Sequence, residues 1–128
     1  MQKRKIKGRF GDETSQRQLR VSELIKRNIS KILIDSNFYD QDGKNYSASV
    51  SEVRCSSDLK IATVYVLPLN KIDPQELTTF LGKNKNSIRH ALGKKLFLKY
   101  LPDLRFKEDT LFEQIEKTNR ILRALEQD

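Results

Sequence analysis

Apolar residues recur at helical spacing near the start of the chain. When successive residues are turned by about 100°, five aliphatic residues fall on one side of a helix. They are Val21, Ile25, Ile29, Ile32 and Leu33. The pattern predicts an amphipathic helix over about 15–36, with these residues facing the core.

Two short runs rich in β-branched residues follow this helix. Residues 46–55 and 60–67 have the composition and length of strands, and the second run, KIATVYVL, is the clearer of the two. Ser, Ser and Asp at 56–58 separate them, as in a tight turn. We therefore expect a β-hairpin.

The first of these runs changes phase partway along. Ala48 and Val50 alternate in one phase, whereas Val53 and Cys55 follow the other. One extra residue in the strand would bring both pairs to the same face of the sheet. We therefore predict a β-bulge near Ser51–Glu52.

The second half of the chain predicts two short helices, a strand and a last helix. Asp73 can cap a helix, Pro74 suits its first turn, and Gly82 is typical of its end. The later elements are expected at 87–97 (helix), 104–107 (strand) and 111–125 (helix). The element order predicts an α+β domain over 15–125, with helices packed on one face of a three-stranded sheet.

The composition indicates a small basic protein. Its 128 residues include 25 Lys and Arg against 17 Asp and Glu, which gives a net charge of +8. Such a charge favours a polyanionic partner, although it does not choose among RNA, DNA and a membrane surface. Residues 1–14 form a basic tail that we expect to be flexible, either a solvated terminus or an arm that contacts RNA. Residues 126–128 form the C-terminal end.

The sequence argues against several functional classes. The single Cys55 fits a reducing cytosol, and with the single His90 it cannot supply the usual ligands of a zinc site. No glycine-rich nucleotide-binding loop occurs, and no apolar run approaches the roughly 20 residues of a membrane helix. Residues 8–11 spell GxxG, the backbone-clamping loop of KH domains, but they precede every predicted element and are rejected as such a loop. We expect a cytoplasmic protein without metal or cofactor.

Basic residues gather in two places. The first set lies on the predicted first helix, in a sector about 80° wide that also contains Leu24: Arg17, Arg20, Arg27 and Lys31. The second set lies around the joint of the two middle helices, near Lys99: Lys83, Lys85, Arg89, Lys94 and Lys95. Both suit contacts to phosphates, and an ordinary solvated surface is the alternative for each. Helical spacing places the second set on several sides.

Four stretches of the chain, in order, resemble one known family. The strongest is 88–106, IRHALGKKLFLKYLPDLRF, and the others are 17–21, RQLRV; 57–66, SDLKIATVYV; and 109–114, DTLFEQ. Together they are similar to ribosome-binding factor A over about 15–125. The resemblance implies a KH-like fold of the bacterial type, without a functional GxxG, and no catalysis by the protein.

The resemblance also implies partners and a local geometry. Family members bind the immature small (30S) ribosomal subunit and its 16S rRNA and promote late maturation, including formation of the rRNA 5′ end. We expect a monomer with no membrane partner, and a maturation GTPase in the same pathway is a further candidate partner. The family carries an Ala-x-Gly kink between the middle helices, whereas this chain has Asn84, Lys85 and Asn86. Asn tolerates left-handed backbone angles, so these residues are compatible with a kink.

Two other classes of function remain as alternatives. The fold could serve as a protein-interaction module, or as a general RNA-binding module that is not specific to the ribosome. A small RNA-processing nuclease is the third interpretation, and it would depend on His90, which has no carboxylate or nucleophile beside it in sequence.

Overall fold

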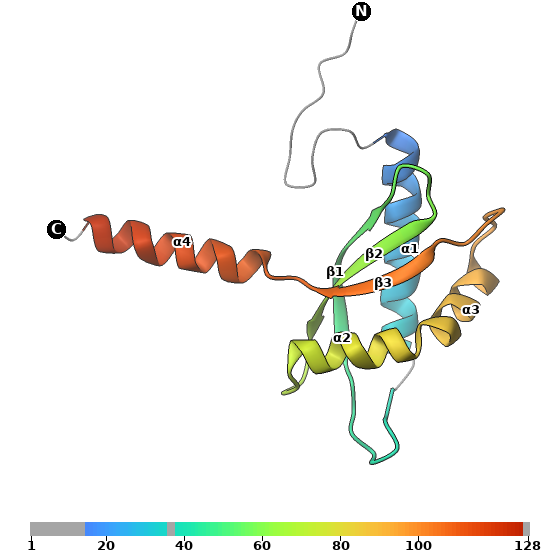
Figure 1. Cartoon of the computed structure of the whole chain (residues 1–128), viewed down its shortest axis with the longest axis horizontal. Coiled ribbons are helices and arrows are strands. Elements are labelled where there is room, and N and C mark those ends of the chain that lie inside the picture. The colour runs from blue at the N-terminus through green and yellow to red at the C-terminus, as the bar shows by residue number, and fades with distance from the viewer. Residues whose placement is uncertain (1–14, 36–37, 127–128) are drawn as a thin grey trace, which may run out of the picture.

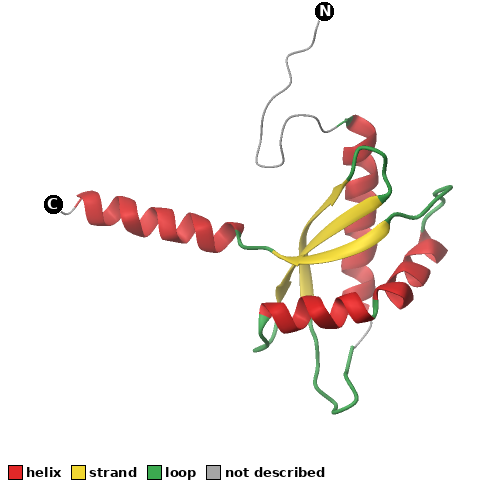
Figure 2. Cartoon of the chain, in the orientation of Figure 1, coloured by secondary structure: helices red, strands yellow, loops and turns green. Residues whose placement is uncertain are grey.

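The computed structural model describes residues 15–35 and 38–126 of the chain, which form four helices and three strands. The elements are α1 (Gln16–Asp35), β1 (Ala48–Cys55), β2 (Ile61–Pro68), α2 (Pro74–Lys83), α3 (Lys85–Lys95), β3 (Asp103–Glu108) and α4 (Leu111–Glu126). Figure 2 shows them by type. This order confirms the predicted α+β arrangement. The predicted tail at 1–14, with its GxxG, and the last two residues lie outside the described residues.

The three strands form one sheet with β2 in the centre. Strands β1 and β2 pair antiparallel as a hairpin, whereas β2 and β3 pair parallel. Parallel neighbours need a crossover connection, which α2 and α3 supply. The register between β1 and β2 shifts between Val50 and Glu52, so the predicted bulge is confirmed.

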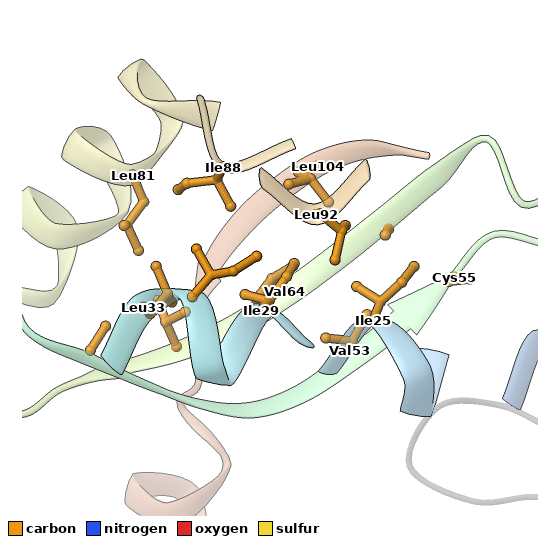
Figure 3. Packing of buried hydrophobic residues seen from close by; sticks show 14 of the residues in the cluster. Ile25, Ile29, Leu33, Val53, Cys55, Val64, Leu81, Ile88, Leu92 and Leu104 are labelled. Atoms are coloured by element: carbon orange, nitrogen blue, oxygen red, sulfur yellow. The ribbon is translucent and has the colours of Figure 1, made fainter. Parts of the chain in front are cut away.

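One face of the sheet carries the hydrophobic core. Helix α1 packs against β1, and α2 and α3 pack against β3. All five predicted aliphatic residues of α1 are buried. Figure 3 shows Ile25 and Ile29 of α1 facing Val64 of β2, with Ile88 and Leu92 of α3 above them. The packing of these helices on a single face confirms the predicted fold.

The last helix is placed differently from the other three. Helix α4 leaves the end of β3 and extends away from the sheet (Figure 1). Its side chains from residue 117 to residue 126 are exposed, including the apolar Ile121, Leu122 and Leu125. Because α1, α2 and α3 already cover the apolar face of the sheet, α4 does not join that layer.

The helix α3 ends two residues earlier than the sequence predicted. Its last residue is Lys95, and Leu96 has an extended backbone with φ −118° and ψ 138°. The prediction extended the helix to Phe97 because Ile88, Leu92 and Leu96 share a helical spacing. Leu96 is buried in either conformation, so the periodicity did not reveal that the chain leaves the helix there.

Candidate nucleic-acid interface

Three predicted cations form an exposed row on α1. Arg20, Arg27 and Lys31 lie on the side of the helix opposite its buried residues. Within residues 15–35 and 38–126, no carboxylate forms an ion pair with any of the three. Leu24 is 38% exposed, and it lines a shallow hollow together with Arg20, Arg27 and one carboxylate, that of Glu23. The row therefore presents charges that a phosphate backbone can contact.

The fourth predicted cation of α1 belongs to a different surface. Arg17 lies near the start of the helix and lines a hollow of about 750 Å³ with Lys60, Arg89, Lys99 and Tyr100. These residues come from α1, the hairpin turn, α3 and the loop before β3. The structure thus places Arg17 in the same hollow as Arg89 of the second set.

Arg89 carries a charge and also forms hydrogen bonds that stabilise the fold. Its Nη2 donates to the carbonyl of Leu101 at 2.8 Å, and its Nε donates to the carbonyl of Pro102 at 3.1 Å. These bonds fasten the loop 96–102 to α3. A guanidinium has five N–H donors, so Arg89 retains donors for a phosphate on its exposed side.

Lys85 is the least available of the predicted cations on α3. Its Nζ lies 3.5 Å from Oδ1 of Asp103, whose Oδ2 accepts from Nε of Arg105 at 3.0 Å. The hydrogen bond from Arg105, with a smaller contribution from Lys85, holds the pKa of the Asp103 carboxyl below its ordinary value. The carboxylate is therefore charged and offsets part of the positive charge of both neighbours.

The other three members of the second set do not share one surface. Lys83, at the end of α2, lines a hollow whose lining also includes Asp40, Asp42, Asp73 and Glu76. That surface is acidic and does not suit a phosphate chain. Lys94 and Lys95 are exposed in the last turn of α3, near the loop 96–102.

The join between α2 and α3 is made at Asn84. Its backbone N–H reaches the carbonyls of Phe80 and Leu81, and its own carbonyl accepts from the N–H of Ile88 at 3.1 Å. With φ −102° and ψ 10°, Asn84 ends one helix and begins the next without a left-handed backbone. Lys85 and Asn86 already belong to α3. Figure 1 shows the chain changing direction at this join.

Two exposed aromatic residues were not among the site residues predicted from the sequence. Phe97 and Tyr100 are both exposed in the loop 96–102, and Tyr100 lines the same hollow as Arg17 and Lys99. The prediction had placed Phe97 at the end of a helix. Leu96, Phe97 and Leu98 are three consecutive apolar residues, so no alternation in the sequence marked Phe97 as the exposed one.

His90 and Cys55 are the side chains that an enzyme interpretation would examine first. His90 is exposed on α3, while Cys55 is buried under α1. Burial raises the pKa of the Cys55 thiol, which disfavours the reactive thiolate. In the part of the chain that the structure describes, no three side chains from His, Cys, Asp and Glu gather as metal ligands. No helix among the described residues is long and apolar enough to cross a membrane.

Comparison with solved structures identifies the same fold elsewhere. The crystal structure of ribosome-binding factor A from Thermus thermophilus superposes with a TM-score of 0.61 and 19% identity, covering 71% of this chain and 93% of the other. A Thermus thermophilus homology model of that factor, fitted into an electron-microscopy map of a 30S complex, superposes with a TM-score of 0.54 and 20% identity. It covers 69% of this chain and 90% of the other. At these identities the likeness shows the fold.

Sequence comparison shows the family. Ribosome-binding factor A of Ruegeria pomeroyi is 46% identical over 111 residues, which cover 87% of this chain and 85% of the relative. The Cereibacter sphaeroides protein of the same description is 44% identical over 111 residues, covering 87% and 79%. A family model described as ribosome-binding factor A matches residues 17–122. The chain therefore belongs to the ribosome-binding factor A family.

Proposed function

We propose that this protein is a non-enzymatic assembly factor that binds the immature small ribosomal subunit through its 16S rRNA. It promotes late maturation of the subunit, including processing of the rRNA 5′ end. Membership of the family supports the proposal, and a Thermus thermophilus factor of the same fold has been fitted into a map of its 30S complex. The observation in this molecule that carries the proposal is the exposed row of cations on α1.

The arrangement of charges indicates how the protein would hold rRNA. Arg20, Arg27 and Lys31 lie along one side of α1, so they can follow successive phosphates of one strand. Each contact releases counterions from the RNA, which makes affinity depend steeply on salt. The cations around the second hollow extend this surface toward the loop 96–102. Binding of this kind stabilises one conformation of rRNA and requires no bond to be made or broken by the protein.

Sedimentation of cell extract through a sucrose gradient tests the binding. We expect the protein to be enriched on free small subunits at low salt and released at high salt. Arg20→Gln with Arg27→Gln should shift it toward the top of the gradient even at low salt. Lys83→Gln is the matched control, since it removes a lysine from the acidic hollow and should not change the profile. Wild-type protein found only at the top of the gradient at low salt would contradict the proposal.

The role in rRNA processing needs its own experiment. In cells depleted of the protein, we expect 16S rRNA with an extended 5′ end to accumulate on free small subunits, as measured by primer extension. The wild-type gene should restore the mature end, whereas the Arg20→Gln, Arg27→Gln variant should restore it poorly. Normal 5′ ends after depletion would limit the function to binding.

One observation favours a protein-interaction role as the second candidate function. The side chains of Ile121, Leu122 and Leu125 are exposed on α4, which extends away from the sheet. If a protein partner covers them, Leu122→Glu should abolish a co-purification that resists nuclease. Co-purification that nuclease removes would favour the rRNA.

A further inference from the structure

We propose that the loop 96–102 is a base-stacking site, where Phe97 and Tyr100 pack against unpaired nucleotides of RNA. The proposal rests on the proposed function, because the small subunit would supply those nucleotides as unpaired 16S rRNA. It assigns a second mode of contact, since the rings would hold bases while the cations hold phosphates.

The exposure of the two rings is the first observation. The Phe97 side chain is fully exposed, at 102% of its reference area, and that of Tyr100 is 77% exposed. Aromatic rings carry large apolar areas whose contact with water is unfavourable, so both rings offer apolar area that a partner can bury. Two such rings lie three positions apart in this one loop.

The second observation is that the loop is held in place. Leu96 and Pro102 are buried at its two ends, and Leu98 and Leu101 pack partly against the core. Arg89 binds the carbonyls of Leu101 and Pro102. The apolar residues of the loop therefore divide into inward anchors and outward rings, and the rings are presented from a fixed backbone.

Glycine at position 93 helps to seat the loop. A Cβ placed on Gly93 of α3 would lie 2.8 Å from Cδ1 of Leu101. The absence of a side chain lets Leu101 pack closely on the helix. The anchors of the loop thus include a contact that a larger residue would displace.

Charge complementarity selects the partner. Lys94, Lys95 and Lys99 flank the rings in sequence, and Nζ of Lys99 lies 5.6 Å from the ring centroid of Tyr100. Four cations line the adjoining hollow and outnumber its two carboxylates, Asp58 and Asp103: Arg17, Lys60, Arg89 and Lys99. Aromatic rings inside a basic groove are the combination that binds single-stranded nucleic acid, because bases stack on rings and phosphates pair with cations.

A second exposed aromatic site shows that exposure alone is not sufficient. Tyr39 is 55% exposed, but Asp40 and Asp42 follow it and Glu76 lines the same hollow. An acidic surface repels phosphates. Tyr39 is therefore the matched control for the loop. Bases within a duplex already stack on each other, so the loop should select unpaired nucleotides.

Tryptophan fluorescence tests the stacking directly. The chain contains no Trp, so the variant Phe97→Trp carries a single reporter at the proposed site. Stacking on a base should quench its emission when single-stranded RNA of about ten nucleotides, within the usual size of such sites, is added. An RNA duplex of the same charge should quench it much less, and the control variant Tyr39→Trp should respond to neither RNA. Equal quenching by duplex and single strand would overturn the proposal.

Affinity for purified small subunits provides the second test. Phe97→Leu with Tyr100→Leu removes both rings and keeps apolar side chains, so affinity should fall by about fivefold to a hundredfold for each stacked base lost. The salt slope of binding, which is the slope of log affinity against log salt concentration, should not change because no cation is removed. Tyr100→Phe should preserve affinity, and Tyr39→Leu should have no effect. Thermal melting confirms that the variants remain folded.

The outcomes separate this proposal from the function on which it rests. Subunit binding that is unaffected by loss of both rings would overturn the stacking site and leave the function standing. If both rings are needed for subunit binding but single-stranded RNA causes no quenching, the rings contact a ribosomal protein and the proposal is wrong. Quenching by single-stranded RNA without any subunit binding by the wild type would support the stacking site and contradict the proposed function.

Discussion

The cations of α1 and those around the join of α2 and α3 look equally available to RNA in the sequence. In the structure their surroundings differ. Arg20, Arg27 and Lys31 share one side of a straight helix, and no carboxylate among the described residues pairs with them. At the join, Lys85 is near Asp103 and Lys83 is on an acidic hollow. Counting basic residues along a sequence therefore overestimates how many can contact RNA.

The difference has a physical cause. A helix repeats its side chains at fixed angles, so cations at suitable spacing on one helix share a surface whatever the rest of the fold does. Around a join of two helices, each cation points in its own direction and meets whichever residues the tertiary fold brings there. Whether a cation at the join can contact a phosphate therefore depends on contacts between distant parts of the chain.

Removing the two arginines of α1 should have the largest effect. Arg20→Gln with Arg27→Gln should lower the salt slope of subunit binding by about two, since each phosphate contact contributes about one. At about 0.1 M salt this change in slope corresponds to about a hundredfold loss of affinity. Binding measured across a salt series checks this. A slope equal to that of the wild type would show that the α1 row does not contact phosphate.

Arg89→Lys should have an intermediate effect. The variant keeps the positive charge but loses the bonds to the carbonyls of Leu101 and Pro102. We expect a loss of roughly 1–3 kcal/mol in the free energy of unfolding, at about 1 kcal/mol for each bond, with little change in salt slope. Urea denaturation measures the stability, and Lys94→Arg is the control. Unchanged stability together with an unchanged slope would mean that Arg89 acts as a charge alone and that its two bonds do not hold the loop.

Asp103→Asn should strengthen binding by a smaller amount. The substitution removes the carboxylate that offsets Lys85 and Arg105, so both become more available to phosphate. We expect a severalfold gain in affinity and a slightly steeper salt slope, measured on purified subunits. Weaker binding by the variant would indicate that Asp103 orients its neighbours for the RNA.

The same carboxyl predicts a small dependence of stability on pH. Because its pKa is lowered in the folded state, chiefly by the hydrogen bond from Arg105, Asp103 stabilises the fold above its unfolded pKa of about 3.9. That contribution is lost as pH falls through the folded pKa. Comparing the unfolding free energies of wild type and Asp103→Asn at pH 6 and at about pH 3 should show the difference shrinking on acidification. A difference that grows on acidification would contradict the assignment.

Lys83→Gln should have the smallest effect on binding. Its neighbours in the hollow are acidic, so its removal should change neither affinity nor salt slope. A slope lowered by about one, as for a phosphate contact, would show that the acidic hollow faces the RNA after all.

Local rules accounted for most of the fold. The buried side of α1 followed from helical periodicity, and the bulge followed from the change of phase between Val50 and Val53. The start of α2 was visible in the capping residue Asp73, whose carboxylate accepts from the N–H of Gln75 at 2.9 Å. Each of these signals depends on residues close together in the chain.

The features that escaped prediction depend on residues far apart. Lys85 and Asp103 are separated by 18 positions, and nothing in either segment indicates that they meet. The end of α3 was misplaced because Leu96 satisfies helical spacing and is also buried in the extended conformation. As a result, the outward position of Phe97 became visible only in the structure.

The most direct test of the account is to map which segments of the protein touch rRNA. Cross-linking of the protein to small subunits that carry photoreactive uridine, followed by mass spectrometry, identifies those segments. We predict cross-links in α1 between Arg17 and Lys31 and in the segment from Lys94 to Tyr100, and none around the acidic hollow near Asp40 and Glu76. Cross-links that map to the acidic hollow, with none in α1, would contradict the account.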